Sequence, residues 1–207
     1  MYTPEYICKE LNFDIDDIWN IYPYGSKVYG TNREDSDDDY IIVFKTSLLR
    51  SGSFKDNAVS NHSKSIQGTP YSKGGFIDAI NNYMMPALEA ISLDDDQIIK
   101  KKFNFKINKF YEKELIKKVI TQSSNSWHIA DKRWVIEKDS EEISLVVKKG
   151  IWHAIRILIF GIQMKKYQKI MVFDEANHLF KEIVDDINFK PSNFLYLRDN
   201  YIEMLKR

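Results

Sequence analysis

The fold is decided by the stretch Tyr24-Gly25-Ser26-Lys27-Val28-Tyr29-Gly30 and, after a short polar segment, Ser36-Asp37-Asp38-Asp39-Tyr40. Ten residues separate the Gly-Ser turn at 25–26 from the Asp-x-Asp pair Asp37 and Asp39, which opens the apolar run 40–44. Side chains of a strand alternate between its faces, so carboxylates two residues apart share a face and can share one divalent cation. Because a glycine lets the backbone approach a phosphate closely, the stretch predicts a site for phosphate and metal.

The composition indicates a folded protein with a real core. The chain has 207 residues, of which 43% are hydrophobic and 14% aromatic, enough for one domain or two small ones. The formal net charge is zero, so the whole-chain charge does not predict binding to nucleic acid or membranes.

The charge is divided unevenly between the two halves. Residues 1–100 contain 9 Lys or Arg and 16 Asp or Glu, a net charge of −7, whereas residues 101–207 contain 21 and 14, a net charge of +7. An acidic half that binds metal and a basic half that binds phosphates would give this division. Two oppositely charged lobes without any site would give it equally well.

Cysteine content and hydropathy predict a cytoplasmic protein without a membrane partner. The single cysteine, Cys8, excludes an intramolecular disulfide and a cysteine-rich zinc site, which favours a reducing compartment. The first residues lack the basic and apolar regions of a signal peptide. The longest apolar stretch, 151–162, contains His153 and Arg156 and is too short to span a bilayer.

The first half of the chain has the pattern of a small α/β unit. It predicts a helix over 4–11 capped by Thr3, strands over 18–24 and 39–45, a short helix over 27–30, a weaker strand over 64–69, and a helix over 72–85 with a further turn to 93. The second strand is nearly all apolar, as expected of a strand covered on both faces. The Ser-, Asn- and Gly-rich segment 46–63 predicts a long loop or insertion.

From residue 94 onward the pattern is helical almost throughout. Helices are expected over 109–122, 141–167 and 174–184, with a last helix after 190–192. We therefore expect two domains, an α/β unit over 1–93 and a helical unit over 94–207. The tryptophans of the second half are candidates for stacking on bases, and better candidates for the core of the helical unit.

The motif suits the transfer of a nucleoside monophosphate. Two metal ions can neutralise both the entering and the leaving oxygen of such a reaction. Mg²⁺ prefers a few carboxylates, completed by substrate phosphates and water, and Asp37 and Asp39 match that supply. Amides of the Gly25-Ser26 turn, and the Ser26 hydroxyl, are candidate donors to the phosphates.

These residues resemble the signature of DNA polymerase β-type nucleotidyltransferases, which include minimal antitoxin-type members that transfer AMP. The fuller string over 25–40 is more similar to a narrower group, the predicted nucleotidyltransferases associated with RNA-repair and RNA-ligase pathways, which are also found in phages. Two later segments fit this group, namely 76–93 with its Asn81-Asn82 and Leu88-Glu89, and the segment Lys149-x-x-x-His153-x-x-Arg156.

The resemblance implies an α+β fold, with a small mixed β-sheet nucleotidyltransferase core flanked by helices and an all-helical C-terminal domain. It implies Mg²⁺ (or Mn²⁺) and an NTP, which we take to be ATP, with an RNA or tRNA end as the acceptor. Asp37 and Asp39 would be both catalytic residues and metal ligands. The residues that would bind the nucleotide are Gly25, Ser26, Lys27, Ser36, Lys149, His153 and Arg156.

The sequence departs from the family pattern at one place. Members usually carry a third carboxylate on the strand before the helix that is expected near Ser72, and here that position holds Gln67. An amide can ligate a metal through its oxygen, but it carries no charge and cannot act as a general base. Asp78 is the nearest alternative acid, although it is expected on the following helix.

Lys149, His153 and Arg156 follow steps of four and three residues, so they share one face of their predicted helix. That face is expected opposite most of the apolar stripe. It is either a basic wall that contacts a triphosphate or an RNA phosphate, or an ordinary solvated helix face.

Three functions remain open at this point. The first is a metal-dependent nucleotidyltransferase, whose acceptor is an RNA end, a tRNA, or a protein Tyr, Ser or Thr as in protein AMP transfer. The second is a catalytically impaired nucleotide- or nucleic-acid-binding module on the same scaffold, which the Gln67 replacement favours. In the third, residues 37–39 form only a solvated acidic turn and bind no metal.

Overall fold

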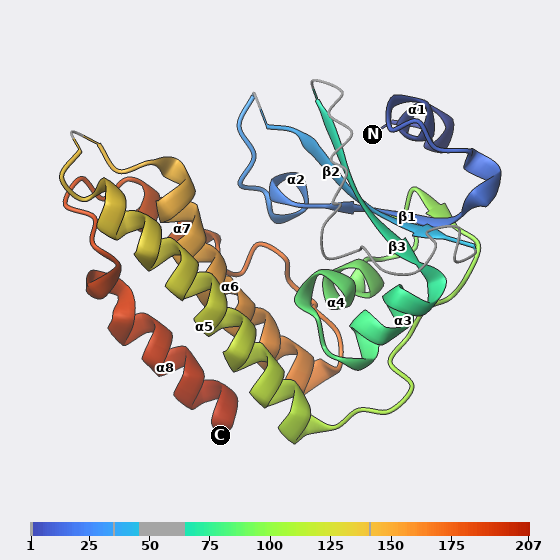
Figure 1. The fold of residues 1–207 in the computed structure, drawn as a ribbon. Helices are drawn as coiled ribbons and strands as arrows, with labels where there is room; N and C mark the ends of the chain where they lie inside the picture. The colour runs from blue at the N-terminus through green and yellow to red at the C-terminus, as the bar shows by residue number, and fades with distance from the viewer. Residues whose placement is uncertain (1, 35, 46–64, 141) are drawn as a thin grey trace. The chain divides into compact units, whose positions relative to one another are not determined.

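The computed structural model describes residues 2–34, 36–45, 65–140 and 142–207 (Figure 1). The chain forms two compact units, one made of Met1–Asn82 with Pro86–Lys109 and the other of Tyr83–Met85 with Phe110–Arg207. The expected loop 46–63 lies outside the described residues.

A four-stranded mixed sheet forms the centre of the first unit. In the order β3-β2-β1-β4, its strands are Ile66–Ser72, Asp38–Phe44, Ile18–Tyr24 and Lys100–Lys101. β1 is antiparallel to both β2 and β4, whereas β2 and β3 are parallel. The expected α+β class with a small mixed sheet is thereby confirmed.

One face of the sheet is covered by α1, Pro4–Glu10, which begins at the expected Thr3 cap. Ile7 and Leu11 of this segment pack with Ile42 of β2 in one buried cluster. The helix approaches β3 closely at Gly68, where a Cβ atom would lie 2.7 Å from Leu11 Cδ1. β2 is buried from Tyr40 to Phe44, because helices cover the sheet on both faces, as its apolar sequence predicts.

The opposite face is covered by α3, Lys73–Asn81, which is followed by α4, Met85–Ser92. The ring of Tyr22 in β1 stacks on Phe76 of α3, with centroids 5.7 Å apart. The single helix expected over 72–85 is wrong, since α3 ends at Asn81. Tyr83 has a φ of 53°, and this left-handed conformation breaks the helix before α4 begins.

Residues 94–109 belong to the first unit, so the domain boundary lies at Lys109 rather than after residue 93. Asn20 of β1 pairs with Lys101 of β4. The fully buried Asn20 side chain also donates to the Phe103 carbonyl at 2.8 Å and accepts from the Phe103 N–H at 3.1 Å. This strand was missed in the sequence because two lysines cannot show an alternating pattern.

The described regular elements of the second unit are all helical. They are α5 Glu112–Glu137, α6 Leu145–Tyr167, α7 Asn177–Val184, the 3₁₀ helix η2 Pro191–Phe194 and α8 Leu195–Lys206. Figure 1 shows α5 and α6 side by side. Among the described helices, none combines the length and apolar character needed to cross a membrane.

α5 continues to Glu137, well beyond the end expected at Gln122. Residues 123–137 are polar and poor in strong helix formers, which hid the helix in the sequence. Trp127 and Ala130 are nevertheless buried, and the core interpretation of Trp127 fits this burial. The packing of Trp127 and Ala130 in the core, rather than intrinsic helix propensity, accounts for the second half of α5.

Two glycines of α6 allow it to pack closely on α5. A Cβ atom on Gly161 would lie 2.5 Å from Val119 Cγ1, and one on Gly150 would lie 2.8 Å from Ala130 Cβ. Contacts this short are not tolerated in a packed core.

We expect Gly161→Ala to lower the free energy of unfolding by about 1–3 kcal/mol, because overpacking against Val119 outweighs the better helix propensity of alanine. Gly74→Ala in α3 is the matched control, since a Cβ atom there has nothing within 4 Å. The control should raise the free energy of unfolding by up to about 1 kcal/mol. Urea denaturation measures both, and equal effects of the two substitutions would contradict the close packing.

Candidate functional site

A close contact between Gly25 and Asp39 is the base of the site. Tyr24, the last residue of β1, pairs with Asp39 of β2, and Gly25 then turns the chain into α2, Ser26–Tyr29. Gly25 has a φ of 79°, and a Cβ atom on it would lie 2.2 Å from Asp39 Oδ2. Both observations require glycine at this position. The turn and the second aspartate of the motif therefore meet.

Gln67 completes the site from β3. It pairs in register with Asp39, and its Nε2 donates a hydrogen bond to Asp37 Oδ2 at 2.7 Å. Register partners of neighbouring strands lie on one face of the sheet, as do residues two apart. Asp39 and Gln67 therefore face the same side, the hydrogen bond brings Asp37, which lies just before β2, to Gln67, and Gln67 stands where the third carboxylate was expected. Asp78 lies exposed on α3.

The donor set fits one Mg²⁺ ion better than two. The two carboxylates are hard oxygen donors, whereas the Gln67 amide turns its nitrogen, and not its oxygen, toward Asp37. Mg²⁺ needs few protein ligands when substrate phosphates and water complete its octahedron. In the described part of the chain, however, no three His, Cys, Asp or Glu side chains gather in a group that could hold a metal. Asp37 and Asp39 are the residues that would hold the ion.

The other expected nucleotide-binding residues near the motif have local partners. Lys27 Nζ forms an ion pair with Asp38 Oδ2 at 2.7 Å. Ser36 Oγ accepts a hydrogen bond from the Arg33 N–H at 2.8 Å, so this hydroxyl organises the loop before β2. Ser26 is half-buried at the first position of α2.

A pocket of about 380 Å³ lies beside the turn. Tyr24, Lys27 and Asp39 contribute to its lining, together with Asp38 and Tyr40. Its volume is in the range of small-molecule sites, and both signs of charge are present in its wall. The motif thus adjoins a space that a ligand can enter.

Glu89 was not assigned a role from the sequence, although it supports the turn. It is only 2% exposed, and the Tyr29 hydroxyl of α2 donates to its Oε2. This contact ties α2, and with it the Gly25 turn, to α4. A single glutamate inside the apolar pattern of 85–92 is a signal that could have identified it, because buried acids require a partner.

The expectation of a basic face opposite the apolar stripe of α6 is wrong. Arg156 is only 2% exposed, and its guanidinium lies over the rings of Trp152 and Phe160, 4.9 and 5.4 Å from their centroids. Its Nη2 also donates to His153 Nδ1 at 2.9 Å. Lys149 is half-buried on the same helix. α6 packs against α5, α7 and α8, so it buries several faces, which a single amphipathic stripe does not predict.

His153 is held in its neutral form. Burial, together with the positive charge of Arg156, lowers the pKa of His153 from 6.5 to about 3. A neutral ring is also what the hydrogen bond requires, because a guanidinium can only donate and Nδ1 must accept. His153 is therefore not a cationic phosphate ligand at neutral pH.

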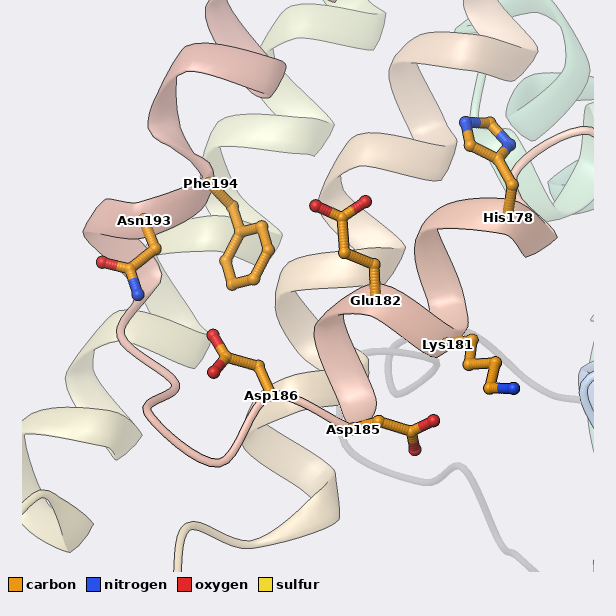
Figure 2. A pocket seen from close by; sticks show the side chains of 7 residues that line it. All are labelled: His178, Lys181, Glu182, Asp185, Asp186, Asn193 and Phe194. Atoms are coloured by element: carbon orange, nitrogen blue, oxygen red, sulfur yellow. The ribbon is translucent and has the colours of Figure 1, made fainter.

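A second, open pocket of about 710 Å³ lies in the helical unit and contains several charged groups (Figure 2). His178 and Glu182 come from α7, and Asp185 and Asp186 follow its end. Figure 2 shows the carboxylates of Asp185 and Asp186 pointing away from each other. Their divergence leaves no converging set of ligands, so we assign no function to this pocket.

Comparison with known proteins adds no relative. A scan of protein-family models and a search of curated proteins both find no match to this chain. Function is therefore inferred from its residues and their geometry.

The neutral His153 makes stability depend on pH. Its folded pKa of about 3 lies below the unfolded value near 6.5, so its contribution is complete above pH 6.5 and is lost as the pH falls toward 3. We expect the free energy of unfolding to decrease over this range by at most about 1.4 kcal/mol per pH unit from this group.

His153→Gln should make that pH dependence shallower, because glutamine can accept the Arg156 hydrogen bond without titrating. Urea denaturation between pH 4 and 7 measures the slope. His128→Gln is the matched control, since His128 is exposed on α5 and should leave the slope unchanged. Identical slopes for wild type and His153→Gln would contradict a histidine that is held neutral in the folded protein.

Proposed function

We propose that this protein is a metal-dependent nucleotidyltransferase that moves a nucleoside monophosphate from an NTP to a hydroxyl group. The observation that carries this proposal is the contact between Gly25 and Asp39 at the head of β2, next to the hydrogen bond that Asp37 accepts from Gln67, the register partner of Asp39. Carboxylates for a cation and a side-chain-free turn for a phosphate thus adjoin each other, next to a pocket.

The protein's contribution is positioning and electrostatics. A bound Mg²⁺ ion supplies neutralisation of the charge on the triphosphate and the reacting oxygens. Asp37 and Asp39 would hold the ion, and amides of the Gly25-Ser26 turn would donate to a phosphate. Lys27 lines the pocket and can exchange Asp38 for a phosphate oxygen, since its side chain is exposed. Such fixed charges act through orientation rather than through covalent chemistry.

We take ATP as the donor and an RNA or tRNA end as the acceptor. The resemblance over residues 25–40 supports RNA, and the net charge of +7 over residues 101–207 is suited to a polyanion. A protein hydroxyl, as in antitoxin-type AMP transfer, stays a second acceptor class. A reducing cytoplasm stays our prediction for the location, supported by the single, buried Cys8.

A second candidate function has its own observation. Gln67 replaces the expected third carboxylate, and its hydrogen bond to Asp37 places it in the site. Because an amide cannot accept the proton of an attacking hydroxyl, the chain would then bind a metal-bound nucleotide but transfer it slowly or not at all.

We expect label transfer when the protein is incubated with Mg²⁺ or Mn²⁺, a pool of small RNAs and labelled ATP, CTP, GTP or UTP in turn. Asp37→Ala and Asp39→Ala should each reduce transfer at least about 100-fold, since each removes a charge that holds the ion. Glu34→Gln is the matched control, since it removes an exposed acid of the segment before the motif. It should retain most of the transfer, because Glu34 does not line the pocket.

The outcomes separate the two candidates. Metal-dependent NTP binding without transfer to RNA or protein would establish the binding module. Absence of metal-dependent NTP binding in the wild type would contradict both candidates and leave residues 37–39 as a solvated acidic turn.

A further inference from the structure

We propose that a pocket in the helical unit, built around the buried ammonium group of Lys148, binds a nucleotide through its phosphate and its base. The inference does not depend on the proposed function, because every described residue that lines this pocket belongs to the second unit. The nucleotide is either a free mononucleotide or the terminal nucleotide of an RNA strand.

This third pocket has a volume of about 710 Å³ and lies among three segments of the helical unit. Trp134 comes from α5, Lys148 comes from α6, and Phe189 and Lys190 belong to the segment that follows α7. The volume is within the range of small-molecule sites. The pocket therefore has room for a ligand of the size of a nucleotide.

The side chain of Lys148 is held in place without losing its charge. The residue is only 9% exposed, and its Nζ donates to the carbonyl oxygens of Val184 at 2.8 Å and Asp186 at 2.9 Å. The same Nζ lies 5.9 Å from the centroid of the Phe189 ring. Carbonyl and ring dipoles attract an ammonium group, but they do not neutralise it.

A ligand with negative charge would supply what Lys148 lacks. In the part of the chain that the structure describes, no carboxylate forms an ion pair with this residue. An ammonium group has three N–H donors, and the two carbonyls leave one of them for a ligand. Because a buried charge is unfavourable unless it is paired, an anion bound here would be stabilised.

The other charged groups of the lining also favour an anion. Lys138 and Lys190 are exposed at the pocket, and Glu142 is the one acid among its described lining residues. Three ammonium groups against one carboxylate make the local potential positive. We therefore assign the phosphate of the ligand to the lysines.

The apolar part of the lining favours an anion that carries a planar ring. Trp134 is half-buried at the pocket, and Ile187 is 93% exposed there. An indole ring stacks on nucleobases, and a base placed against Ile187 would remove apolar surface from water. A nucleotide combines a phosphate for the lysines with a base for Trp134 and Ile187.

Binding of AMP in the presence of EDTA tests the proposal, because EDTA removes the cations on which a site at Asp37 and Asp39 would depend. The full chain is titrated with AMP, and the indole N–H signals of its four tryptophans are followed by ¹H–¹⁵N NMR. We expect AMP to shift the signal that is missing from Trp134→Phe. Inorganic phosphate should bind at least about tenfold more weakly, since it has no base to stack on Trp134.

Substitutions of the lysines provide a second measurement. Lys138→Gln and Lys190→Gln should each raise the Kd for AMP about two- to fivefold, as expected for a solvent-exposed ion pair. Lys148→Met should raise it at least about tenfold, because it removes a buried charged donor. Lys132→Gln is the matched control and should leave the Kd unchanged, since Lys132 is exposed on α5 and does not line the pocket.

A 5′-phosphorylated RNA pentamer distinguishes the two sources of the nucleotide. A pentamer that shifts the Trp134 signal and binds more tightly than AMP identifies the end of a strand as the ligand. Equal or weaker binding of the pentamer identifies a free mononucleotide. Both results support the site, provided that Lys190→Gln weakens the binding and Lys132→Gln does not.

Three results would overturn the proposal: no shift of the Trp134 signal with either probe, equal affinity for AMP and inorganic phosphate, or equal effects of Lys190→Gln and Lys132→Gln. If Lys148→Met does not fold, the Trp134 signal and the variants of the exposed lysines still decide. Because divalent cations are absent from these measurements, their failure would leave the nucleotidyltransferase assignment intact.

Discussion

The close approach of the Asp39 carboxylate to the backbone of Gly25 is the constraint on which the first unit depends. With Asp39 Oδ2 only 2.2 Å from where a Cβ atom of residue 25 would lie, no other residue fits. The φ of 79° adds a second, independent requirement for glycine. This one contact joins the end of β1, the start of α2 and the head of β2. A triphosphate site needs those three elements in register, so the fold and the proposed chemistry share one requirement.

A hydrogen bond between α2 and α4 also holds the Gly25 turn in place. The Tyr29 hydroxyl of α2 donates a hydrogen bond to the buried Glu89 of α4. This contact with α4 fixes the position of α2, the short helix that follows Gly25. Leaving a buried glutamate without its partner is unfavourable, which makes the α2 position costly to change. Because α2 has only four residues, it cannot hold its own conformation by helix formation alone.

Local patterns in the sequence predicted what depends on local structure. The apolar run of β2, the Thr3 cap and the distance from the turn to the Asp pair all led to correct elements. Arg156 was placed wrongly because helical periodicity shows how residues share a face, not how many faces the neighbouring helices cover. β4 and the boundary at Lys109 depend on pairing between segments about 80 residues apart, and the Phe103 contacts of Asn20 have no local signal.

For Gln67, the sequence predicted the position of the residue but not the orientation of its side chain. Its place at the expected third carboxylate followed from alignment with a motif, and the structure adds that it pairs in parallel register with Asp39. The direction of its amide did not follow, because that depends on where Asp37 lies once β2 and β3 pair across a long connection. Asp37 and Asp38 of the motif have different hydrogen-bond partners. Lys27 neutralises Asp38, whereas the amide that holds Asp37 leaves its negative charge in place. Asp37 can therefore be held in position and still attract a cation, which a lysine in place of Gln67 would prevent.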